Sequence, residues 1–85
     1  MNPEATTKLF AIGNMFNSAG KMVKDGLVEP EFIWQFHSPF SILLMWEKVK
    51  PLVDKWREIW NDSSVWESFE YLYDITKNKH PDVKV

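Results

Sequence analysis

A chain of 85 residues is too short for a second independent core, and its 45% hydrophobic and 15% aromatic residues predict one folded domain over residues 1–85 instead of a disordered segment. A formal net charge of -2, with lysines spread along the chain, argues against a nucleic-acid partner. The absence of cysteine excludes disulfides, thiolate catalysis and cysteine-ligated metal sites, and it suits a cytoplasmic protein.

The first predicted helix covers about residues 4–25. Its apolar residues recur at intervals of three and four and therefore share one face: Leu9, Ile12, Met15, Phe16, Ala19, Met22 and Val23. Gly26 is expected to end this helix, because glycine accepts the left-handed conformation of a C-cap. Gly13 and Gly20 lie beside the apolar stripe, where they either admit a close neighbour or weaken the helix.

A short second helix is predicted over about residues 30–37, because proline and acidic residues suit a first helical turn. Its inward-facing residues are expected to be Phe32, Ile33 and Phe36. Trp34 points to a different side. Ser38 and Pro39 then supply the N-cap and first residue of another helix, so the second helix ends near residue 37.

The third predicted helix, about residues 39–60, is the longest. Apolar residues alternate four and three apart along it and form a seam: Ile42, Trp46, Val49, Val53, Trp56 and Trp60. Pro51 lies inside this pattern and removes one backbone hydrogen bond, which predicts a kink near it. The seam keeps its phase across Pro51, and this favours one bent helix over two shorter ones.

The fourth predicted helix runs over about residues 64–79. Residues 61–64 form a turn, and Ser64 with Glu67 matches a capping box at the start of the helix. Its inner face is expected to contain Val65, Phe69, Leu72 and Thr76. Pro81 prevents extension of the helix, and residues 81–85 are expected to be a frayed tail.

These elements predict an all-α fold, an antiparallel bundle of four helices, because no stretch alternates with the period of a strand and the connections are short. Helical spacing places Trp46, Trp56 and Trp60 in the core. Trp34 and Trp66 are as compatible with the core as with a surface or pocket.

No catalytic, cofactor-binding or metal-binding residues are predicted. Glu67, Glu70 and Asp74 share an arc opposite the apolar face of their helix, which is typical of a solvated surface. His37 and His80 belong to no metal-ligand spacing, and the phosphate-binding and nucleophile motifs are absent. The chain therefore looks like a non-catalytic protein without a cofactor.

No membrane-spanning segment is predicted either. The longest purely apolar run covers residues 42–46, far fewer than the ~20 residues of a spanning helix. The amino terminus carries acid and proline where a signal peptide needs basic residues before an apolar core.

The start of the third helix is apolar on all sides, because some of its residues point away from the seam. Three partner helices from so short a chain leave part of this surface without cover, so we expect a self-complementary homodimer or contact with another protein. Burial by the second helix within one chain is an equal alternative. The candidate interaction surface comprises Phe40, Leu43, Leu44, Trp34 and Phe10.

A second class of function is the binding of a small apolar ligand between the helices. Aromatic side chains provide apolar walls for such a pocket, and a histidine provides a polar group. The candidate pocket residues are Trp34, His37, Trp66 and Tyr73.

Several short motifs also occur in order along the chain. They are Phe16, Gly26-Leu27-Val28-Glu29-Pro30-Glu31, Trp46-Glu47 with Pro51, Asn61-Asp62, Trp66 and Phe69-Glu70-Tyr71-Leu72. Over about residues 12–78 they resemble a family of uncharacterised small helical domains of bacteria and archaea. Members of that family often follow a transmembrane helix, which implies a membrane-proximal cytoplasmic module in those chains. The resemblance implies no catalytic residue, because the family has no established activity.

Overall fold

The structure is a computed structural model that describes residues 3–85 and contains no strand within that range. It has four helices in this part of the chain: α1 (Pro3–Lys24), α2 (Pro30–Phe36), α3 (Pro39–Ile59) and α4 (Glu67–Lys79). The all-α class and the four helices are confirmed. The helix ends agree with the prediction to within one residue, except at the start of α4.

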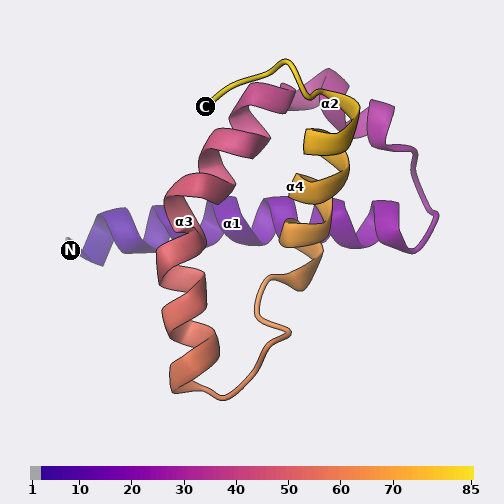
Figure 1. The fold of residues 1–85 in the computed structure, drawn as a ribbon. Helices are drawn as coiled ribbons and strands as arrows, with labels where there is room; N and C mark the ends of the chain where they lie inside the picture. Colours follow the sequence, from indigo (N-terminus) through magenta and orange to yellow (C-terminus); the bar gives the residue numbers. More distant parts are fainter. Residues whose placement is uncertain (1–2) are drawn as a thin grey trace.

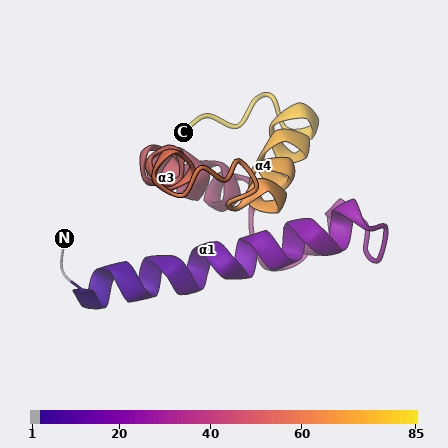
Figure 2. The same ribbon diagram turned by 90° about the horizontal axis from the view of Figure 1, so that it is seen from below.

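The helices form two layers (Figures 1 and 2). The helices α3 and α4 lie side by side and run in opposite directions, and α1 crosses both of them on one side. The most extensive contact joins α1 to α4, followed by that between α3 and α4. An antiparallel arrangement of all four helices is therefore not confirmed, because α1 lies across the α3–α4 pair. The connection from α1 to α3 includes α2, which redirects the chain.

Two glycines of α1 make this crossing possible. A Cβ atom at Gly13 would overlap the indole ring of Trp66, and a Cβ at Gly20 would overlap the carbonyl group of Ser68. Both glycines are buried. They admit a close neighbour, and this advantage outweighs their low helix propensity, which costs about 1 kcal/mol per residue.

The helix α3 continues through Pro51 without a break, as expected. Its axis changes direction about half-way along, where proline lacks the N–H that would bond to the preceding turn (Figure 1). At its start, the hydroxyl of Ser38 accepts a hydrogen bond from the Ser41 N–H at 3.2 Å. The predicted N-cap is confirmed.

The core lies where α1, α3 and α4 meet. Its cluster of buried residues comprises Phe16, Val23, Ile33, Ile42, Trp46, Val49, Val53, Trp66, Phe69 and Leu72. The predicted seam is confirmed as far as Val53, and Trp56 is partly buried. Trp60 is 57% exposed, so its assignment to the core was wrong. The lower end of α3 extends past α1 and α4 and has no helix beside it (Figure 1).

The start of α4 differs from the predicted capping box. The helix begins at Glu67, and the preceding Trp66 has left-handed backbone angles with φ 51°. Ser64 does not cap it, because its own N–H and hydroxyl donate to Asp62 Oδ1 at 2.9 and 2.6 Å. The cap comes from α1, where Asn17 Oδ1 accepts a hydrogen bond from the Phe69 N–H at 2.9 Å.

Candidate interaction surface

Three phenylalanine side chains are exposed on α2 and in the first turn of α3. Phe36 is 67% exposed, and Phe32 and Phe40 are about half exposed. The rings of Phe32 and Phe36 contact each other with centroids 5.1 Å apart, and Phe40 follows four residues later. We call these three residues the phenylalanine face.

The other side of α2 is held against α4. Ile33 is buried, and Trp34 Nε1 donates a hydrogen bond to Thr76 Oγ1 at 3.1 Å. The ring of Trp34 also meets that of His80 edge-on, with centroids 4.6 Å apart. A helix of seven residues has only one covered side here, so Phe32 and Phe36 face outward. The prediction that they point inward was wrong.

The predicted interaction residues are divided between surface and core. Phe40 is exposed, and Leu44 is partly buried. Leu43 is only 2% exposed, contrary to the expectation that it faces a partner. Trp34 is engaged with α4, and the ring of Phe10 stacks on Trp56 at 4.7 Å. Sequence periodicity alone did not reveal which side of α2 is covered, because that depends on where α4 ends.

The four predicted pocket residues take part in separate contacts. His37 packs its ring on Phe16, with centroids 5.1 Å apart, whereas Trp34 packs on His80. Trp66 Nε1 donates to Asn14 Oδ1 at 2.9 Å, and Tyr73 donates to Glu47. Among the described residues, these four side chains therefore do not line one common pocket.

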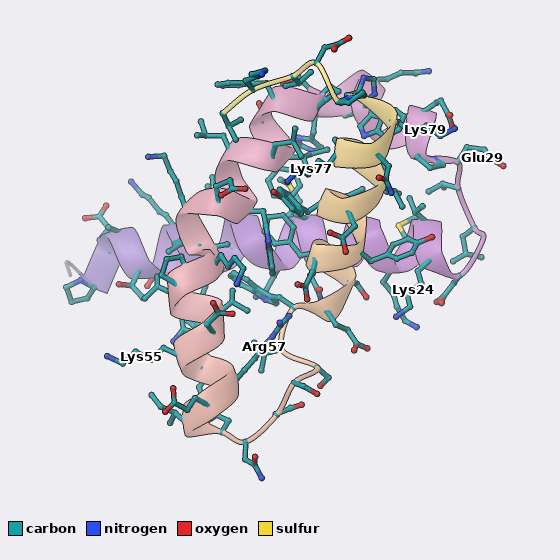
Figure 3. The ribbon with its side chains drawn as sticks, viewed as in Figure 1. Lys24, Glu29, Lys55, Arg57, Lys77 and Lys79 are labelled. Atoms are coloured by element: carbon teal, nitrogen blue, oxygen red, sulfur yellow. The ribbon has the colours of Figure 1, made fainter. Side chains whose placement is uncertain are left out.

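Two of the three acidic side chains of α4 pair with basic side chains of α1 and α3. Glu70 accepts a hydrogen bond from Arg57 Nη2 at 3.1 Å, and Arg57 also donates to the Val65 carbonyl group from Nε and Nη2 (Figure 3). Glu67 forms a long ion pair with Lys24 at 3.9 Å. Partial burial, followed by the charge of Glu70, raises the pKa of Asp74. Within residues 3–85, no three acidic or histidine side chains are grouped as a metal site would need.

Charges of both signs lie at the start of α2 and the end of α4. Glu29 precedes α2 and Lys79 ends α4, and both lie at the same end of the molecule (Figure 3). Glu31 adds a second acid in the first turn of α2.

Comparison with known proteins assigns the chain to a family. The model of DUF4760, a domain of unknown function, matches residues 1–76. The chain belongs to the DUF4760 family. The phenylalanine face and the core lie within the matched region, whereas the last turn of α4 and the residues after it lie beyond it. No curated protein and no solved structure matches the chain. Among the described residues, no helix is long and apolar enough to cross a membrane.

Proposed function

We propose that this domain acts through protein contacts, without catalysis, and that it associates with a second copy through the phenylalanine face. The observation that carries the proposal is the exposure of Phe32 and Phe36, whose rings contact each other, and of Phe40 at the start of the next helix. Exposed apolar side chains that gather in one place are typical of interaction sites, because their burial releases ordered water.

A second copy suits this face because a two-fold interface brings the same surface together from both chains, so each phenylalanine side chain gains an apolar neighbour from its counterpart. Another protein with an apolar surface is the alternative partner.

The test is the oligomeric state of Phe36→Ser against a matched control. Phe36 and Ile59 are 67% and 64% exposed, but Ile59 lies at the far end of α3. In a two-fold dimer the substitution removes two buried rings, about 2–4 kcal/mol in total, which corresponds to a roughly 30- to 1000-fold weaker association. Sedimentation equilibrium should show a dimer for the wild type and for Ile59→Ser, and a monomer for Phe36→Ser.

A wild-type chain that stays monomeric at several hundred micromolar would contradict self-association. Equal weakening by both substitutions would contradict the location of the interface. Circular dichroism of each variant controls for folding, and we expect no change because both side chains are exposed.

Binding of a small apolar ligand remains without a supporting observation, since its four candidate residues make separate contacts. For the location of the protein we propose the cytoplasm. Disulfides are typical of small domains in oxidising compartments, and this chain has no cysteine to form one.

A further inference from the structure

A cleft of about 540 Å³ lies between α1 and the start of α4, where the two helices cross (Figure 2). Its lining includes Asn17, Ser18 and Lys21 of α1 and Glu67 and Ser68 of α4. Sites for small molecules typically have volumes of about 300–1,000 Å³. The cleft is therefore large enough to hold a small molecule.

The hydroxyl of Ser68 is a buried polar group without a partner. The residue is only 5% exposed, and its hydroxyl forms no hydrogen bond with residues 3–85. In this range, His80 Nε2 is the only fully enclosed side-chain nitrogen or oxygen that lacks a partner. The Ser68 hydroxyl is therefore reached from the cleft that the residue lines. Because native proteins normally satisfy buried hydroxyls, this unpaired group points to a ligand.

The backbone N–H of Ser68 is unpaired at the same place. In the first turn of α4, the N–H groups of Glu67, Phe69 and Glu70 all have acceptors. That of Ser68 has none within the described part of the chain. It lies at the positive end of the α4 dipole, where negative charge is favoured. One residue thus offers a hydroxyl and an amide donor next to each other.

The helix α1 adds further donors to the cleft. Asn17 uses its Oδ1 to accept from the Phe69 N–H, so its side-chain NH₂ is left without an acceptor among residues 3–85. Lys21 Nζ pairs with Asp25 Oδ1 at 3.1 Å, and the lysine side chain is 62% exposed. Exposed pairs of this kind contribute little to stability, so the ammonium group is available to a ligand. Donors without acceptors therefore predominate in the cleft.

Glu67 is the one acidic residue in the lining of the cleft. Its carboxylate forms the long ion pair with Lys24 at 3.9 Å, and both side chains are about half exposed. The positive charge of Lys24 and the surrounding solvent reduce the repulsion between Glu67 and a bound anion. Glu67 therefore weakens anion binding in this cleft without preventing it.

We propose that the cleft binds a small molecule through an oxyanionic group, a phosphate or a carboxylate, with the hydroxyl and N–H of Ser68 as the central donors and Asn17 and Lys21 beside them. An oxyanion accepts several hydrogen bonds at once, which suits a site where donors lack acceptors. The start of a helix adds a favourable field for negative charge. The cleft shares no residue with the phenylalanine face, so the proposal does not depend on self-association.

The experiment follows the amide resonance of residue 68 in nitrogen-15 labelled full-length protein. Sodium phosphate and sodium acetate are titrated separately at pH 7, with the ionic strength held constant by sodium chloride. We expect a saturating shift with a Kd on the order of 10 mM for at least one of the two ions. The ion that binds more tightly identifies the anionic group as a phosphate or a carboxylate.

Two variants should change the affinity in opposite directions. Ser68→Ala removes one donor to a charged acceptor and should weaken binding roughly 10-fold. Glu67→Gln removes a negative charge and should strengthen binding about 3-fold. The matched control is Ser63→Ala, because Ser63 is exposed and lies outside the lining of the cleft. Its affinity should equal that of the wild type.

Urea denaturation without phosphate or acetate provides an independent readout. Ser68→Ala should be as stable as the wild type, because the Ser68 hydroxyl has no partner to lose. A clear loss of stability would show that the hydroxyl is needed by the fold and would overturn the proposal. The proposal is also overturned if neither ion gives a saturating shift up to about 100 mM. Equal affinities of Ser68→Ala and the wild type, or weaker binding by Glu67→Gln, would have the same consequence.

Discussion

Folding strongly raises the pKa of the Tyr73 phenol. Its hydrogen bond to Glu47, together with partial burial and the negative charge of Glu47, raises its pKa from 10.0 to about 12. A folded-state pKa above the unfolded value means that folding favours the neutral phenol. The resulting stability is complete below pH 10 and is lost as the pH rises toward 12.

We therefore expect the unfolding free energy of the wild type to fall more steeply between pH 10 and pH 12 than that of Tyr73→Phe. The difference should be about 1 kcal/mol, because solvent reduces the effect of a partly exposed pair. Urea denaturation followed by circular dichroism at several pH values measures it. Lysine deprotonation affects both proteins equally, so parallel pH profiles would contradict a stabilising role for this bond.

The burial of individual residues was predictable where the apolar periodicity of a single helix indicates it. Ile42, Trp46, Val49 and Val53 follow a regular seam, and all four are buried. Trp60 continues the same seam but is exposed, because no other helix reaches the end of α3. The exposure of Phe36 was missed for a related reason: a short helix shows no periodicity that distinguishes its covered side from its free side.

At the scale of elements, the start of α4 depends on a contact between helices. Asn17 of α1 accepts a hydrogen bond from the backbone N–H of Phe69, 52 positions later in the sequence. Asn17→Ala should destabilise the fold by about 1–2 kcal/mol, because it leaves a partly buried N–H without a partner. Ser64→Ala should cost less than about 0.5 kcal/mol, because Ser64 is exposed and caps no helix.

Thermal or urea denaturation of these two variants decides between the predicted capping box and the cap observed in the structure. A larger loss for Ser64→Ala than for Asn17→Ala would support the capping box and contradict the role of α1. Circular dichroism before denaturation shows whether α4 keeps its helical content in both variants.

The helix ends that the sequence predicted correctly have local signals, whereas the cap from Asn17 does not. Proline, glycine and serine act within a few residues of a helix end, so the ends at Lys24, Phe36 and Ile59 were predicted to within one residue. The cap from α1 has no local signal. The crossing of α1 over α4 has none either, because Gly13 and Gly20 indicate a close neighbour without identifying which helix it is.

In the whole molecule, three helices meet at Phe69. Its ring contacts Phe16 of α1 and Trp46 of α3 with centroids 5.2 and 5.0 Å apart, and Trp66 at 6.0 Å. The residue has no exposed surface. Because this aromatic cluster lies at the centre of the buried residues that the structure describes, the stability of the fold depends strongly on it.

Phe69→Ala should therefore remove a large share of the stability of the domain. The loss is about 3–5 kcal/mol for a buried phenylalanine, against a total stability of about 4–13 kcal/mol for a chain of this length. Phe69→Leu keeps most of the volume and should cost about 1–2 kcal/mol, which urea denaturation can measure on folded protein. Trp60→Ala, at a 57% exposed ring, should cost less than about 1 kcal/mol. A similar loss for Trp60→Ala and Phe69→Leu would mean that the outer end of α3 contributes as much to stability as the centre of the core does.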